Sequence, residues 1–236
     1  MSQEIVALAL TAASLGFVHT VLGPDHYVPF IAMSKARGWS LLRTSLVTFA
    51  CGLGHVMSSV LIGIVGIVFG VGVMKLETLE GIRGNIAAWL LMGFGLAYFV
   101  WGVHKAIKNR PHRHHHAHPG CPEHSHEHSH GNEHAHAHDG GNRSITPWVL
   151  FTIFLFGPCE PLIPLVMYPA AKGSMQGVLT VTAIFGVITI ATMMTIVMMS
   201  SWSFAFIRFE KAERYMDALA GASILGCGIA IEFAGL

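Results

Sequence analysis

Charge is what this sequence has least of. Only 11% of its residues are Asp, Glu, Lys or Arg, whereas 53% are hydrophobic and the mean hydropathy is +0.56. A soluble globular domain carries about 25% charged residues, so the composition excludes that class and indicates an integral membrane protein. The formal net charge of +1 identifies no charged partner. We expect the lipid bilayer and metal ions as partners, and no nucleic acid.

Cysteine is also scarce. The four cysteines, Cys51, Cys121, Cys159 and Cys227, show no paired spacing, and three of them lie in apolar segments. This pattern excludes a disulfide scaffold. Residues 1–22 lack a basic start and a clear small-residue cleavage site, so we expect a retained first helix rather than a signal peptide.

Long apolar runs dominate what is present. A helix needs about 20 apolar residues to cross the hydrocarbon core of a bilayer. Six segments are long enough: 4–24, 41–73, 85–107, 146–170, 175–203 and 214–235. The sequence therefore predicts an all-α membrane protein with six transmembrane helices.

A short motif occurs twice, 134 positions apart. Gly23-Pro24-Asp25-His26 matches Gly157-Pro158-Cys159-Glu160 in place. In the same register Gly52 falls on Gly186. These matches predict two three-helix repeats, residues 1–110 and 145–236, each with a first helix that is broken by Gly-Pro.

The Lys and Arg residues predict the orientation. One side of the predicted membrane holds eleven of them: Lys35, Arg37, Arg43, Lys105, Lys108, Arg110, Arg113, Arg143, Arg208, Lys211 and Arg214. The other side holds Lys75, Arg83 and Lys172. Because the basic side faces the cytoplasm, we expect a multi-pass protein of the inner (plasma) membrane with both termini outside. The two repeats are then inverted, as in many transporters.

The broken first helix carries the candidate site. It holds His19, Asp25 and His26 beside the Gly-Pro pair. Ionisable side chains at membrane depth are costly and mark pathways or sites, and broken backbone is tolerated there only inside protein or along a wet cavity. Imidazole and carboxylate together suit nickel, cobalt or zinc. We predict a metal site of His19, Asp25, His26 and, from the next helix, His55, with Cys159 and Glu160 added by the second repeat.

Histidine is concentrated in one segment, 111–144. Twelve of the sixteen histidines lie there: His112, His114, His115, His116, His118, His124, His126, His128, His130, His134, His136 and His138. Pro, Gly, Ser and Glu fill the gaps, so the segment cannot bury a core and we expect it to be disordered without ligand. Its composition is typical of metal binding. We predict a cytoplasmic metal-collecting loop.

Residues 16–29, 54–58 and 157–171 resemble the nickel/cobalt transporter superfamily. The resemblance is to its six-helix members: nickel/cobalt efflux proteins, and relatives of the UreH-like and sulfite exporter TauE/SafE-like kinds. It implies transport of Ni²⁺ or Co²⁺, with export as the direction, and neither an enzyme nor a prosthetic group. The family signature has four residues between the first histidine and Asp-His, whereas five separate His19 from Asp25. The extra residue turns His19 by about 100° around the helix, so Asp25 and His26 match the signature more directly.

Other functions stay open. The Gly-Pro-Cys break also resembles thiol-electron carriers of the CcdA/DsbD type, which need a reactive cysteine in each repeat; Asp25 stands at the position equivalent to Cys159. An accessory protein that delivers metal to an enzyme such as urease is a second alternative. An exporter of sulfite or an organic anion would need a basic site, and the six predicted spans place no Lys or Arg deep in the bilayer. A homo-oligomer is open in every case.

Overall fold

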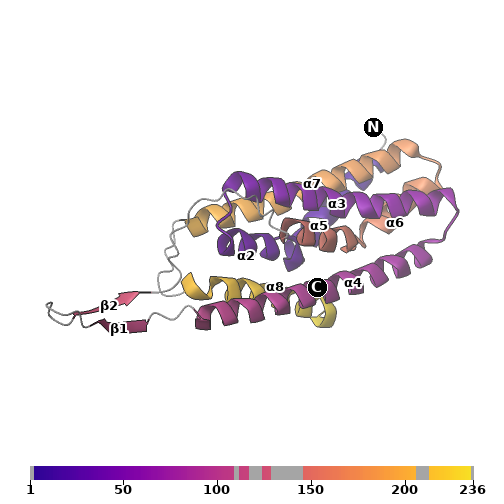
Figure 1. Cartoon of the computed structure of the whole chain (residues 1–236). Helices are drawn as coiled ribbons and strands as arrows, with labels where there is room; N and C mark the ends of the chain where they lie inside the picture. Colours follow the sequence, from indigo (N-terminus) through magenta and orange to yellow (C-terminus); the bar gives the residue numbers. More distant parts are fainter. Residues whose placement is uncertain (1–2, 109–111, 117–123, 129–145, 206–212, 235–236) are drawn as a thin grey trace.

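The computed structural model describes residues 3–108, 112–116, 124–128, 146–205 and 213–234, and nearly all of them are helical (Figure 1). In chain order the elements are α1 (Gln3–Leu22), the 3₁₀ turn η1 (Pro24–His26), α2 (Val28–Ala36), α3 (Leu41–Val68), α4 (Val73–Lys108), β1 (His112–His116), β2 (His124–His128), α5 (Thr146–Phe156), α6 (Leu162–Ala171), α7 (Met175–Ala205), the 3₁₀ turn η2 (Glu213–Tyr215) and α8 (Met216–Ala234).

Five helices of the described residues are long and apolar enough to cross a membrane: α1, α3, α4, α7 and α8. Large apolar side chains such as Leu10, Leu42 and Trp148 are exposed on the surface of the bundle, where lipid would cover them. The chain is therefore an all-α, multi-pass membrane protein. The predicted span 146–170 corresponds to two short helices, α5 and α6, of 11 and 10 residues.

Both Gly-Pro motifs interrupt a helix. After α1, the chain passes through Gly23 into η1 and then α2; after α5, it passes through Gly157 and Pro158 into α6. Proline has no backbone N–H and its ring collides with the preceding turn, so it ends a helix or begins a new one. Each break therefore frees backbone groups inside the bundle.

Helix α4 is longer than the sequence indicated. It begins at Val73 rather than near residue 85, so Glu80 and Arg83 lie within a helix. The assignment of Arg83 to a loop is wrong, as is the expectation that no Lys or Arg is buried in a span. The side chain of Arg83 is only 11% exposed, and that of Glu80 is completely buried. A charged side chain can be buried within a helix when the protein supplies a partner of opposite charge.

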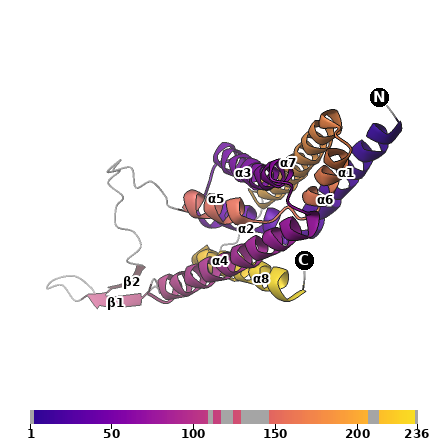
Figure 2. The ribbon, with the colours of Figure 1, turned by 90° about the vertical axis from the view of Figure 1, so that its right-hand side faces the viewer.

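Helix α8 lies side by side with the C-terminal half of α4 (Figures 1 and 2). Gly95 and Gly102 on α4 and Gly221 on α8 form the contact, and a Cβ atom on any of them would overlap the backbone of the other helix. Small residues allow membrane helices to approach this closely. Elsewhere α1 packs on α7, and α3 packs on both α5 and α7.

Two apolar clusters form the interior. One includes Phe30, Phe154 and Ile224, and the other includes Ala12, Leu162 and Phe185. The ring of His55 contacts Phe154, and the ring of His19 contacts Phe185. His19 and His55 therefore lie where the two clusters meet.

Strands β1 and β2 form an antiparallel hairpin in the His-rich segment, with His112 opposite His128 and His116 opposite His124. The remaining histidines of the segment, His118, His130, His134, His136 and His138, lie outside the described residues. The boundaries of the segment and its role as a metal collector stay predictions.

The contact between α4 and α8 gives a test of the fold. Replacing Gly221 with Ala puts a methyl group into the backbone of Phe99, so the two helices must separate. We expect the variant to lose about 1–3 kcal/mol of stability, measured as a lower melting temperature of the detergent-purified protein. Gly226→Ala on the same helix is the matched control, because its Cβ would meet nothing within 4 Å. Equal melting temperatures for the two variants would contradict this packing.

Candidate metal centre

Three histidines from three elements converge inside the bundle. His19 comes from the end of α1, His26 from η1 and His55 from the middle of α3. One ring nitrogen of each lies within 4.8 Å of the others. His26 and His55 are buried and His19 is half-buried. In the described part of the chain, these three are the His, Cys, Asp or Glu side chains that come close enough to share a metal ion.

The first Gly-Pro break brings His26 back to His19. Gly23 adopts an extended conformation and Pro24 begins η1, whose first bond runs from the His26 N–H to the Gly23 carbonyl. The turn places the His26 ring 4.7 Å from the His19 ring, centroid to centroid. A Cβ atom on Gly23 would lie 2.5 Å from Nδ1 of His26, so only glycine leaves room for this ring.

Asp25 orients His26. Nδ1 of His26 lies 3.0 Å from a carboxylate oxygen of Asp25 and 3.1 Å from the Gly23 carbonyl oxygen. Both partners only accept hydrogen bonds, so Nδ1 carries the proton and donates it. In the neutral ring the Nε2 atom then carries a lone pair. A carboxylate that fixes a histidine in this way is the usual outer partner of a metal-binding imidazole.

The lone pair of His26 faces His55. The two Nε2 atoms are 3.3 Å apart. Two nitrogens that bind one ion at about 2.0–2.1 Å in tetrahedral geometry lie about 3.4 Å from each other. The spacing therefore suits a shared metal ion. Imidazole nitrogens suit zinc, copper, nickel and iron, and they do not suit magnesium or calcium.

The residues predicted from the second repeat lie differently. Cys159 is buried in the α5–α6 break, and its sulfur is 3.9 Å from Nε2 of His19. Glu160, the next residue, is exposed in the turn before α6 and does not join the histidine group. The structure thus brings His19, His26 and His55 together, places Asp25 behind His26 and Cys159 beside His19, and leaves Glu160 outside.

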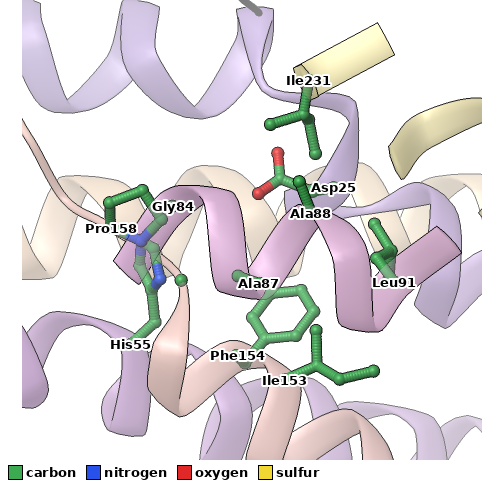
Figure 3. Close-up of a pocket in the computed structure, with 11 residues that line it drawn as sticks. Asp25, His55, Gly84, Ala87, Ala88, Leu91, Ile153, Phe154, Pro158 and Ile231 are labelled. Carbon is green, nitrogen blue, oxygen red and sulfur yellow. The ribbon is translucent and has the colours of Figure 1, made fainter. Parts of the chain in front are cut away.

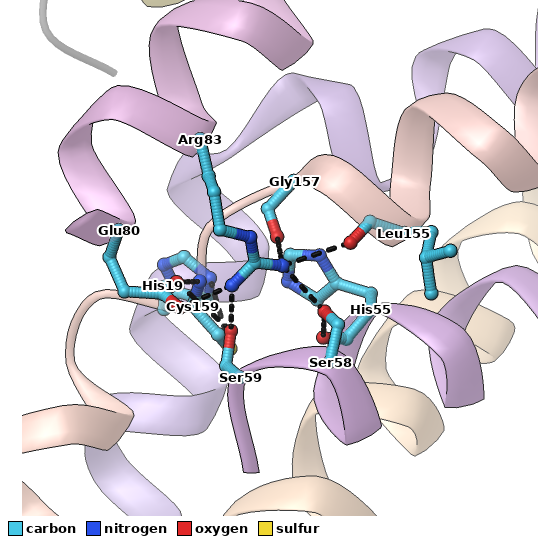
Figure 4. Close-up of polar contacts among 9 residues, drawn as sticks. All are labelled: His19, His55, Ser58, Ser59, Glu80, Arg83, Leu155, Gly157 and Cys159. Carbon is cyan, nitrogen blue, oxygen red and sulfur yellow. Dashed lines mark hydrogen bonds and ion pairs between the residues drawn. The ribbon is translucent and has the colours of Figure 1, made fainter. Parts of the chain in front are cut away.

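A buried ion pair beside the site was not predicted. Glu80 and Arg83 pair with each other on α4. Glu80 accepts hydrogen bonds from the Ser59 hydroxyl and the Cys159 backbone N–H, both at 3.0 Å (Figure 4). The only sequence signal was two opposite charges with helical i, i+3 spacing just before a predicted span.

The guanidinium of Arg83 donates hydrogen bonds to groups on two helices, α3 and α5. It bonds the Ser58 hydroxyl at 2.7 Å and the Leu155 carbonyl at 2.9 Å (Figure 4). Longer bonds at 3.3 Å reach Ser59 and the Gly157 carbonyl. With these partners and Glu80, the guanidinium is already engaged and offers no free binding site for an anion.

A small cavity of about 20 Å³ adjoins Asp25 and His55. The small residues Gly84, Ala87 and Ala88 of α4 also line it (Figure 3). The volume suits about one water molecule. Nδ1 of His55 is buried without a hydrogen-bond partner. The cavity thus puts space for one water next to the histidine whose outer nitrogen is unsatisfied.

Fold and site together define a class: a multi-pass helical membrane protein with a buried histidine cluster suited to a transition-metal ion. Comparison of the chain with family models, curated proteins and solved structures finds no match.

Gly23 tests whether the orientation of His26 matters for metal binding. Gly23→Ala keeps every candidate ligand but pushes the His26 ring away from Asp25, so we expect a loss of Co²⁺ affinity of about tenfold or more. The measurement is Co²⁺ titration followed by visible absorption. Subtracting a His19→Ala/His26→Ala/His55→Ala triple variant removes the signal of the His-rich segment.

The matched control for this experiment is Gly93→Ala, because a Cβ atom there meets nothing within 4 Å. We expect this control to bind Co²⁺ like the unchanged protein. Unchanged affinity in Gly23→Ala would show that the placement of His26 is irrelevant to metal binding.

Proposed function

We propose that this protein transports a divalent transition-metal ion, nickel or cobalt, across a membrane in the direction of export. His19, His26 and His55 bind the ion on its way. The observation that carries the proposal is the convergence of three imidazoles within 4.8 Å inside a multi-pass helical bundle. Buried ionisable groups at membrane depth mark ion pathways.

The ligand set suits a divalent transition-metal ion. Here three histidines meet and Asp25 supplies one negative charge behind them. The site borders both broken helices, at the α1–α2 break and at the α5–α6 break. Transporters place their binding sites at such breaks.

The pattern of helix contacts supports two inverted repeats. In such repeats α3 corresponds to α7, and the α1–α2 pair corresponds to α5–α6. A pseudo-two-fold axis then relates the contact between α1 and α7 to the contact between α5 and α3. Both contacts are present. The α4–α8 contact maps onto itself. In this scheme α5 and α6 together form the sixth crossing, as a discontinuous helix.

The orientation follows from the charges. With Arg83 paired inside α4, Lys75 and Lys172 are the basic residues left on the side opposite the eleven. The His-rich segment then lies in the cytoplasm, where it would collect the ion for export. The resemblance to nickel/cobalt efflux proteins implies the same direction.

The alternatives have less support. Cys51, Cys159 and Cys227 are buried and free, so none of the described cysteines forms the pair that a thiol-redox carrier needs. An anion exporter would need a free basic group, and Arg83 is engaged. A metal-delivery accessory protein would keep the histidine site but show no flux.

Transport of Ni²⁺ or Co²⁺ into proteoliposomes tests the proposal. A metal-quenched dye inside the vesicles reports the flux. His26→Ala removes one ligand, and we expect the initial rate to fall about tenfold or more. His104→Ala is the control, because His104 is exposed at the end of α4 and its loss is expected to change the rate less than twofold. No flux with the unchanged protein, or equal rates for both variants, would contradict the proposal.

The collecting role of the His-rich segment has its own test. Replacing its twelve histidines with Asn should reduce transport at low metal concentration and leave the maximal rate unchanged, because a collector raises the local concentration without forming the pathway. The measurement is the concentration dependence of flux with the cytoplasmic side facing the metal. A reduced maximal rate would place these residues on the pathway instead.

A further inference from the structure

The Glu80–Arg83 pair occupies the place of a missing backbone hydrogen bond. In an unbroken helix the Cys159 N–H would donate to the Leu155 carbonyl four residues earlier. The Gly157-Pro158 break separates these two groups. Leu155 instead accepts from Arg83 at 2.9 Å, and Cys159 donates to Glu80 at 3.0 Å (Figure 4). The ion pair therefore joins the two cut ends of the α5–α6 helix.

The backbone between the cut ends lies against the histidines. A Cβ atom on Gly157 would be 2.9 Å from Nδ1 of His55, so this glycine is in close contact with the ring. Two residues on, the Cys159 sulfur lies 3.9 Å from Nε2 of His19. The pair thus holds the segment that contributes the second-repeat wall of the site.

The same pair is tied to the helix that carries His55. Ser58 and Ser59 are three and four residues after His55 on α3, and their hydroxyls bond Arg83 and Glu80. Side chains at this spacing lie on the same face of a helix. Through Glu80 and Arg83, helix α4 therefore holds both the turn of α3 that carries His55 and the α5–α6 break.

A sulfur ligand is within reach of this arrangement. A metal bound at about 2.0–2.1 Å to nitrogen and about 2.3 Å to sulfur in tetrahedral geometry separates the two ligand atoms by about 3.6 Å. The observed 3.9 Å from His19 to Cys159 is close to that value. Because Cys159 is outside the group within 4.8 Å, its sulfur must move toward His26 and His55 when the ion binds.

We propose that Glu80 and Arg83 are positioning residues that hold Cys159 beside the histidine cluster, so that its thiolate becomes the fourth ligand of the bound ion. The thiol proton is released to water as the metal–sulfur bond forms. The inference rests on the proposed function. It narrows the substrate to borderline ions that accept mixed nitrogen and sulfur ligands, such as Co²⁺, Ni²⁺ and Zn²⁺, and excludes Mg²⁺ and Mn²⁺.

Co²⁺ bound to the purified full chain tests the inference, because thiolate bound to cobalt gives an intense charge-transfer absorption that imidazole does not. We expect this band in the difference between the unchanged protein and the triple histidine variant. Cys159→Ser should abolish it while the weaker visible bands of cobalt remain.

The ion pair is tested by a double variant. A single substitution leaves one buried charge without its partner and is expected to destabilise the fold, so Glu80→Gln/Arg83→Gln removes both charges at once. We expect the charge-transfer band to fall below about a third of its normal intensity. Arg83→Lys keeps the positive charge but lacks the forked guanidinium that reaches several acceptors. We expect this variant to show only part of the charge-transfer band of the unchanged protein.

The matched control is Lys105→Gln/Asp217→Asn. This pair also joins α4 to another helix, with Lys105 Nζ 2.7 Å from Asp217, but it does not contact the site. A purely structural role for ion pairs on α4 would make both double variants lose the band equally; we expect the control to keep it.

The other outcomes of the cobalt experiment distinguish failure of this inference from failure of the proposed function. Co²⁺ bound at the histidines without the charge-transfer band, or a band that survives Glu80→Gln/Arg83→Gln, overturns this inference and leaves the proposed function standing. No Co²⁺ at the histidine cluster in the unchanged protein overturns both.

Discussion

A backbone that is cut inside a bilayer leaves N–H and C=O groups that water cannot reach, and the protein itself must satisfy them. This chain is cut twice, at Gly23-Pro24 and at Gly157-Pro158. At the first cut the chain turns tightly through η1. At the second cut, a buried ion pair from α4 forms hydrogen bonds with the backbone carbonyl and N–H groups that the break separates. The histidine site lies against both cuts, so its geometry depends on how they are satisfied.

The chemistry of the site follows from those local arrangements. Asp25 and the Gly23 carbonyl fix the proton of His26 on Nδ1, which directs a lone pair toward His55. Gly157 leaves room for the His55 ring, and Cys159 lies beside His19. Helices α1 and α3 and the turn η1 thus supply three imidazole nitrogens, and the α5–α6 break supplies a wall of the site and a sulfur beside it. The 3.3 Å between the Nε2 atoms of His26 and His55 is also the spacing at which two imidazole nitrogens share one metal ion.

Sequence reasoning reached the membrane class and the histidines, because apolar length and ionisable residues beside Gly-Pro are local signals. It placed Asp25 among the ligands, whereas the carboxylate bonds His26 from behind. It also missed Glu80 and Arg83. Their partners, Ser58, Ser59 and the α5–α6 break, are far away in the chain, and no local pattern reports that a charged turn will be buried against them. The start of α4 depends on the same long-range contacts.

The most direct measurement is anomalous diffraction from crystals of the full chain loaded with Ni²⁺. We expect an anomalous peak among His19, His26 and His55, about 2.0–2.1 Å from their ligand nitrogens. Peaks confined to the His-rich segment, with the buried histidines unbound at saturating metal, would contradict the account.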